Sequence, residues 1–265
     1  AGDDEPLTTL EAELAESATI PVHHVVLGER RPLTRNLVEV DVLPAGDAPL
    51  AQPGPDTFFY VLWPTGEEEL PDGYSMADFQ AQGPDGEVRG AYYTVRRIDP
   101  ATGALTLWVQ DHGTDGLGAS LTHAAVGTRF ALWGPRTGFA PPSDVAGVVL
   151  AADETGLAAS ASIIEHLAPS VRVVAVFDVA DQACRAPMPD HPGLEVTWLH
   201  RDGRPPGTGT ELADAVRALE LGDDGWWAFG AAESRQVTAV RRHLRDDRGW
   251  LAERVFMTGY WRRPR

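Results

Sequence analysis

The stretch Gly90–Arg97 places an aromatic ring, a hydroxyl group and a guanidinium group within four residues, as Tyr93, Thr94 and Arg96. It predicts a strand, in which Tyr93 and Thr94 point to opposite faces. At a strand end, however, the backbone can bring both to one flat ligand. The ring stacks on the ligand, the hydroxyl bonds its edge and the arginine neutralises attached phosphate. A flavin has these needs, but the eight residues alone favour an amphipathic edge strand with solvated arginines.

A second stretch, His112–Ser120, is rich in glycine and lies between a predicted strand and a predicted helix. Glycines let backbone amides approach a ligand closely, and a helix N-terminus offers free N–H groups to phosphate. The pair Gly116 and Gly118 is a weak signal, because Leu121 stands where a dinucleotide fingerprint requires glycine. An ordinary glycine turn is therefore the simpler interpretation, and His112 is equally consistent with a structural histidine.

Polar and aromatic residues also mark the second half of the chain. Ala152–Leu157 follows a predicted strand, and open α/β sheets bind ligands at the carboxyl ends of their strands. Asp153 or Thr155 can also simply cap the helix that follows. Arg201 comes after a later strand and suits a solvated loop, and the aromatic residues of Thr258–Arg263 suit packing anchors near the C-terminus.

Taken in this order, the stretches resemble the motifs of the siderophore-interacting proteins, a branch of the ferredoxin-reductase superfamily. Tyr93–Arg96 is similar to the flavin-binding motif Arg-x-Tyr-Ser/Thr, but Ala91 replaces its first arginine, which normally contacts the FAD pyrophosphate. Arg89 and Arg129 are the two candidates to supply that charge. The other similar segments are His112–Ser120, Ala152–Leu157, Thr197–Gly203, Trp227–Glu233 and Thr258–Arg263.

The resemblance implies an FAD-dependent ferric-siderophore reductase that uses NADPH or NADH. The flavin carries the chemistry, so no catalytic side chain is expected. Arg97, Arg262 and Arg263 are expected to face the anionic siderophore. Asp153 and the adjacent Glu154 would repel phosphate, so we expect them to cap and position rather than to catalyse. The cofactor-binding residues implied by the resemblance are Tyr93, Thr94, Val95, Arg96, His112, Gly116, Ala119, Ser120, Asp153, Thr155, Arg201, Tyr260 and Trp261.

Two other functions stay open. A flavin reductase or ferredoxin-type reductase with another electron acceptor differs only in the surface above the flavin. The replacement of the motif arginine by Ala91 also leaves room for a non-catalytic carrier of flavin or siderophore. The choice between NADPH and NADH is likewise open.

The elements that must position these residues follow two patterns. Up to Trp133, predicted strands alternate with Gly, Pro and Asp turns, which favours a closed, six-stranded antiparallel β-barrel. From Val145 onward strands alternate with helices, which predicts an α/β domain with a parallel sheet. The acidic segment Pro64–Glu87 is expected to be a surface insertion. The expected organisation is an N-terminal extension with a short helix (1–20), an FAD-binding barrel (21–134), a linker (135–144) and an NAD(P)H-binding α/β domain (145–265).

Composition narrows the function classes. The formal net charge of −17 argues against nucleic acid as the main partner. No run approaches the roughly 20 apolar residues that a membrane span needs, and no secretory pattern opens the chain, so a cytoplasmic protein is expected. Cys184 is the single cysteine, which excludes an intramolecular disulfide. The eight histidines are scattered, so no metal site is expected.

Overall fold

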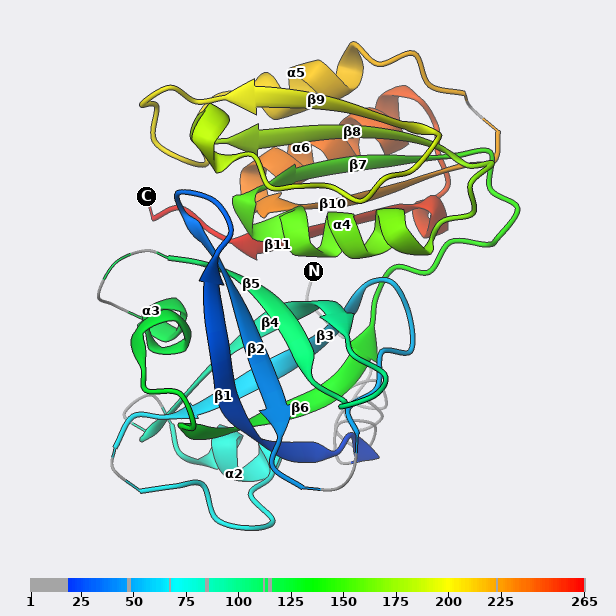
Figure 1. Ribbon diagram of the computed structural model, residues 1–265. Helices are drawn as coiled ribbons and strands as arrows, with labels where there is room; N and C mark the ends of the chain where they lie inside the picture. Colours follow the sequence, from blue (N-terminus) through cyan, green and yellow to red (C-terminus); the bar gives the residue numbers. More distant parts are fainter. Residues whose placement is uncertain are drawn as a thin grey trace, which may run out of the picture.

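The computed structural model describes residues 19–46, 49–66, 68–83, 86–111, 113, 116–222 and 224–264. The helix expected within residues 1–20 lies almost wholly outside this set, and so does His112. Within the set, two bodies are stacked on one another (Figure 1), a barrel below and a layered sheet domain above.

The first body is a closed barrel of six antiparallel strands, so the predicted barrel is confirmed. The strands neighbour one another in the order β1-β2-β5-β4-β3-β6. Alternating side chains fill the interior, as Phe59, Val61 and Val95 do, while their neighbours face outward. The strands are β1 (Val22–Pro32), β2 (Leu37–Pro44), β3 (Thr57–Pro64), β4 (Val88–Ile98), β5 (Leu105–Gln110) and β6 (Arg129–Thr137).

Two short helices accompany the barrel. Helix α2 (Met76–Ala81) lies in the predicted insertion and begins with a capping box between Ser75 and Asp78. Helix α3 (Gly116–His123) follows β5 and sends Leu117 and Leu121 into the barrel core. The first turn of α3 is therefore held beside the end of the barrel, next to β4.

The second body is a parallel five-stranded sheet in the order β11-β10-β7-β8-β9, as expected for an α/β domain. Helix α4 lies on the face toward the barrel, and α5 and α6 cover the other face (Figure 1). Strands β8 and β9 are added on one side of β7, and β10 and β11 are added on the other side. In such sheets, ligands bind at the point between the two central strands where the strand order changes direction. The elements are β7 (Gly147–Asp153), α4 (Leu157–His166), β8 (Arg172–Val179), β9 (Leu194–His200), α5 (Glu211–Arg217), β10 (Trp226–Glu233), α6 (Ser234–Arg242) and β11 (Val255–Trp261).

The two bodies share a core. Leu37 and Trp108 of the barrel join the apolar cluster formed by α4 and the sheet. Phe139, after β6, packs against Phe229 and Phe256 with ring centroids 5.5 and 6.3 Å away. An interface with this much apolar contact fixes the barrel against the sheet, so the ends of β4 and β11 can form one site.

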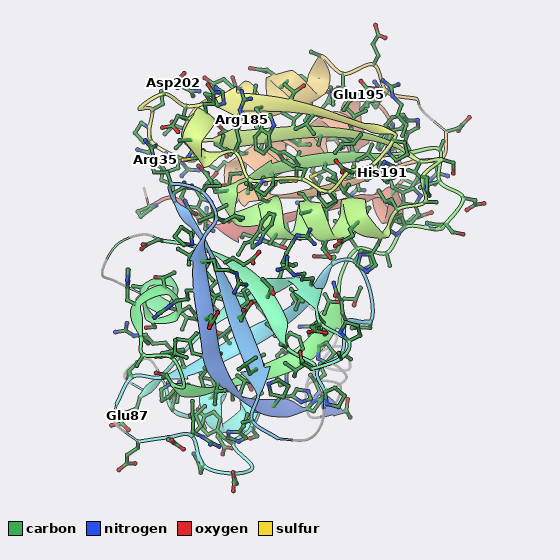
Figure 2. All side chains as sticks on the ribbon, in the orientation of Figure 1. Arg35, Glu87, Arg185, His191, Glu195 and Asp202 are labelled. Carbon is green, nitrogen blue, oxygen red and sulfur yellow. The ribbon has the colours of Figure 1, made fainter. Side chains whose placement is uncertain are left out.

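The hairpin between β1 and β2 makes a second, polar contact between the domains. Arg35 at its tip pairs with Asp181 at 2.5 Å, and the Asn36 amide donates to Glu154 at 3.3 Å. Figure 2 shows Arg35 at the edge of the sheet domain where Arg185 and Asp202 lie. Across the stretches described here, no helix combines the length and apolarity that a membrane crossing requires.

Candidate functional site

The motif strand β4 carries a bulge directly after the Tyr-Thr pair. Val95 is opposite Leu107, but Arg97 is opposite Thr106, so Arg96 is one extra residue in the ladder. A bulge of this kind re-aims the side chain at that position. The side chain of Val95, a residue that was expected at a cofactor, is fully buried in the barrel core.

Tyr93 lies against the first turn of α3. A Cβ placed on Gly118 would be 3.7 Å from the Tyr93 hydroxyl, and burial alone raises the pKa of this phenol to about 12. Gly116, at φ +86°, has open space where a side chain would extend. Ser120 donates back to the Gly116 carbonyl at 3.4 Å, and Ala119 is buried. The Tyr93 hydroxyl thus lies beside the first turn of α3, and the N-terminus of a helix suits a phosphate group.

Thr94 meets the last strand of the other domain. Its hydroxyl lies 3.0 Å from the hydroxyl of Tyr260 in β11, and Thr94 itself is buried. Tyr260 is 37% exposed, yet its hydroxyl end is enclosed. Its pKa is raised because the phenol is desolvated and because the charge of Asp56 lies nearby.

Asp56 is a buried carboxyl group in a stretch that carries no recognised motif. Asp56 is 1% exposed, and its Oδ2 accepts a hydrogen bond from the Phe139 backbone N–H at 3.1 Å. Its Oδ1 has no hydrogen-bond partner among the residues that the structure describes. Burial raises its pKa to about 7, against the smaller opposing effect of the Phe139 bond. At neutral pH the carboxyl is therefore close to half protonated.

Two arginines of the motif strand, Arg96 and Arg97, form ion pairs within the protein. The Arg96 guanidinium, which was expected at a cofactor, pairs with Glu165 of α4 at 2.6 Å and lies 5.3 Å above the Trp108 ring. Arg97 pairs with Glu39 at 3.1 Å on the barrel surface. These two arginines serve ion pairs within the protein, because the bulge turns them toward carboxylates instead of toward Thr94.

At the carboxyl end of β7, Asp153 caps the turn η1 (Glu154–Gly156), as predicted. Its Oδ1 accepts the Thr155 N–H at 2.9 Å, and its Oδ2 accepts the Trp261 indole N–H at 2.7 Å. Burial is the main reason that its pKa rises to about 6. Trp261 is thus held at the carboxyl end of β7, whereas Tyr260 contacts Thr94.

Arg201, which was expected to contact a nucleotide, is buried. It is 4% exposed, pairs with Glu154 at 2.6 Å and donates to the Asp178 carbonyl at 3.0 Å. The Glu154 carboxylate also accepts the Ala180 N–H at 2.7 Å and the Asn36 amide. The network joins three strand ends to the barrel hairpin, so Arg201 is a structural ion-pair partner.

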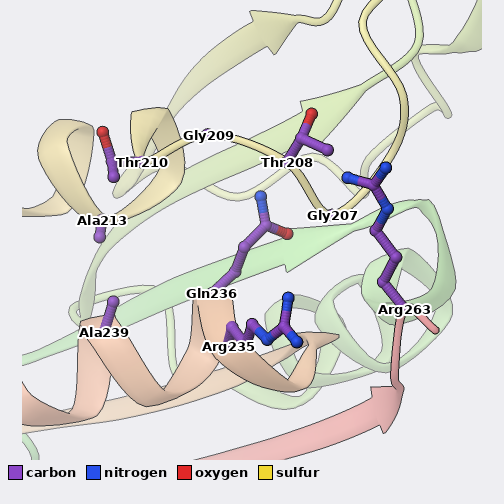
Figure 3. Close-up of a pocket in the computed structure, with 9 residues that line it drawn as sticks. All are labelled: Gly207, Thr208, Gly209, Thr210, Ala213, Arg235, Gln236, Ala239 and Arg263. Carbon is purple, nitrogen blue, oxygen red and sulfur yellow. The ribbon is translucent and has the colours of Figure 1, made fainter. Parts of the chain in front are cut away.

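A pocket of about 390 Å³ opens at the carboxyl ends of the sheet strands, between the loop before α5 and the start of α6 (Figure 3). Arg235 and Arg263 bring two guanidinium groups to it, and Arg263 points toward Thr208. Gln236 is 5% exposed, and its Oε1 has no hydrogen-bond partner among the residues that the structure places. Arg263 was expected at the siderophore, and in the structure it lines this pocket.

Sequence reasoning missed Arg235, Gln236 and Asp56, which carry no motif. The one available signal was the pattern Glu-Ser-Arg-Gln after a strand, which marks a helix start and hence an anion site. Arg262 is exposed. Within the parts of the chain that the structure places, no three His, Cys, Asp or Glu side chains are grouped to hold a metal ion.

Residues 145–264, the sheet domain with its C-terminal tail, match the family of siderophore-interacting proteins. This α/β domain belongs to the siderophore-interacting protein family. The whole chain, including the barrel, is similar to a siderophore utilization protein from T. fusca, with a TM-score of 0.80 and 28% identity over 93% of this chain and 94% of that one. A flavohemoglobin from Malassezia yamatoensis, solved with bound FAD and heme, shares the fold alone, at a TM-score of 0.66 and 14% identity over 96% of this chain and 64% of that one.

Mycobacterial relatives are longer than the region that this chain matches. The mycobactin import ATP-binding/permease protein IrtA of Mycobacterium tuberculosis is 26% identical over 175 residues, which are 64% of this chain and 19% of IrtA. An uncharacterised protein of the same species is 29% identical over 65% of this chain and 64% of its own length. The chain thus spans about a fifth of IrtA and just under two thirds of the other relative.

Proposed function

We propose that this chain is an oxidoreductase that binds FAD and NADPH and reduces the ferric iron of a siderophore. The observation that carries the proposal is the meeting of Thr94, at the end of the motif strand, with Tyr260, at the carboxyl edge of the parallel sheet, 3.0 Å apart. This contact would bring a flavin bound to the barrel next to a nucleotide bound at the carboxyl edge of the sheet. Membership of the α/β domain in a siderophore-interacting family supports the substrate.

The residues present fit FAD. Tyr93 offers an aromatic face and a hydroxyl beside the first turn of α3, where Gly116 leaves the backbone open. Thr94 would hold the reactive edge of the flavin ring, and the amides of Ala119 and Ser120 would contact the diphosphate. When bound, FAD converts the electron pair of a hydride into the single electrons that ferric iron accepts.

The charge of the missing motif arginine is best supplied by Arg89. In β4 this residue is on the same face as Ala91 and Tyr93, is exposed, and stands opposite Trp63. Arg129, the other candidate, pairs with Glu69 at 3.0 Å. An arginine that already serves a carboxylate is the weaker phosphate ligand.

The pocket of Figure 3 supports NADPH as the electron donor. Arg235 and Arg263 would neutralise a phosphate that NADH lacks, and the unpartnered Gln236 Oε1 would accept a hydrogen bond from a ribose hydroxyl or an adenine amine. Asp153 and Trp261 hold the intervening edge of the sheet in a defined shape. Ferrous iron is held less well than ferric iron by hard oxygen donors, so reduction leads to release.

An anaerobic assay tests the proposal. Purified protein is loaded with FAD and given a ferric siderophore with NADPH or, separately, with NADH, and ferrous iron is trapped by a coloured chelator. Colour that depends on the protein and on NADPH is the expected result. Bleaching of the flavin without ferrous iron would replace the siderophore by another acceptor, and a protein that binds no FAD would leave a carrier function.

A further inference from the structure

The outer face of the barrel carries two cross-strand rows of side chains, of which the function described so far uses only Thr94. Register places Arg136 of β6, Phe58 of β3 and Thr94 of β4 in one row. The next row is Trp133, Tyr60 and Tyr92 on the same three strands. The rows are adjacent, so their side chains form one continuous surface that begins at Thr94 and Tyr260.

The rings of these rows are packed edge to face. Tyr92 is 55% exposed, and its ring centroid is 5.6 Å from that of Phe58 and 4.7 Å from that of Tyr60. Gly90 follows on the same face, where a Cβ would collide with the Tyr60 ring at 2.2 Å. The packing fixes Tyr92 without covering it, so an aromatic face is held ready for a ligand at little entropic cost.

A guanidinium group completes the surface. Arg136 lies over the Phe58 ring at 5.6 Å and over the Trp133 ring at 5.5 Å. No carboxylate in the portion of the chain covered by the structure forms an ion pair with it. In a protein with a formal charge of −17, Arg136 is thus a cation held in place by rings and not neutralised by an acid.

We propose that Tyr92, Phe58 and Arg136 bind the ferric siderophore, and that they select chelates whose iron ligands are catecholate or phenolate rings. This inference rests on the proposed function, because the surface leads to Thr94 and Tyr260, where electrons would leave the flavin. An aromatic ligand ring stacks on Tyr92, and Arg136 compensates the charge of the complex. Catecholate complexes of ferric iron keep a net negative charge, whereas tris-hydroxamate complexes are neutral and have no ring at the metal.

Binding of gallium(III) complexes tests this site without turnover, because gallium(III) has the charge of ferric iron and is not reduced. FAD-loaded protein is titrated in a calorimeter with gallium tris-catecholate and with gallium tris-acetohydroxamate. Tyr92→Ala and Arg136→Gln should each weaken catecholate binding about tenfold and change hydroxamate binding less than about twofold. Tyr92→Phe keeps the ring and should retain binding.

Arg172→Gln is the matched control, because Arg172 also lies over a ring, that of Trp226, at 5.7 Å, but in the sheet domain. The proposal of a selective site would be overturned if the variants bound both gallium complexes equally more weakly, or if they bound both as well as the wild type does. A parallel loss of FAD affinity in Tyr92→Ala would also overturn it. Failure of the proposed function looks different. The FAD-loaded protein would then reduce no ferric chelate with NADPH, while the gallium titration would still show the dependence on Tyr92.

Discussion

The hydroxyl of Tyr260 in β11 lies 3.0 Å from the hydroxyl of Thr94 in β4, across the boundary between the two domains. The two residues are 166 positions apart in sequence. Tyr260 is the point where the C-terminal strand of the sheet meets the motif strand of the barrel, and Asp56 lies behind this contact. The site is therefore built from both domains, and it depends on how they are held together.

Tyr93→Ala should lower the affinity for FAD at least tenfold, because it removes the ring and the hydroxyl that face α3. Fluorescence titration of the unloaded protein with FAD measures the change. Tyr74→Ala, in the barrel insertion, is the control and should leave the affinity unchanged. Unchanged flavin binding in Tyr93→Ala would remove Tyr93 from the site.

Arg89→Gln should weaken FAD binding about tenfold and reduce its dependence on salt, because a phosphate contact is lost. Arg129→Gln should have an effect of less than about twofold, since Arg129 is paired with Glu69. Titrations with FAD at two salt concentrations compare the variants. The reverse order of effects would assign the phosphate to Arg129.

Arg235→Gln and Arg263→Gln should each raise the KM for NADPH about tenfold and leave the KM for NADH nearly unchanged, because only NADPH carries the additional phosphate. Steady-state kinetics with both donors provide the measurement, and Arg172→Gln is the control. Equal changes for the two donors would mean that the pocket does not recognise the 2′-phosphate.

Glu165→Gln should destabilise the protein by about 1–3 kcal/mol, because it leaves the buried Arg96 guanidinium without its charged partner. The exposure of Glu165, 49%, keeps the effect below that of a fully buried pair. Glu195→Gln breaks a pair with the exposed Arg172 and should cost less than about 1 kcal/mol. Urea unfolding of both variants is the test, and equal losses would contradict the role of Arg96 in the interface.

Asp56→Asn should stabilise the protein at pH 8 and have little effect at pH 4. The folded-state pKa is raised from an ordinary 3.8 to about 7, so the folded state binds more protons than the unfolded state between these values. Wild-type stability therefore falls as pH rises through this window, by about 4 kcal/mol at most. The asparagine variant avoids this loss. Urea unfolding of both proteins at pH 4 and pH 8 measures the difference in stability. A variant that is less stable than the wild type at pH 8 would mean that the charged Asp56 carboxylate stabilises the folded protein.

Local patterns were enough for the order of the elements. Alternating residues predicted the six barrel strands, and the strand–helix alternation after Val145 predicted the parallel sheet, because these patterns reflect which face of each element is buried. The cap at Asp153 was also predicted, since a cap depends on its immediate neighbours. The strand β11 was not expected, because the aromatic residues near the C-terminus suggested packing anchors.

The sequence by itself determined the two-domain fold, the barrel strands and the placement of Tyr93 and Thr94 on β4. Only the tertiary structure decided which charges meet. It paired Arg96 with Glu165 and Arg201 with Glu154, moved Arg263 to the pocket of the sheet domain and left Arg136 stacked between two rings. The physical reason is range. Burial patterns are encoded in neighbouring residues, whereas an ion pair depends on distances between side chains that are far apart in sequence and are fixed only when the domains pack.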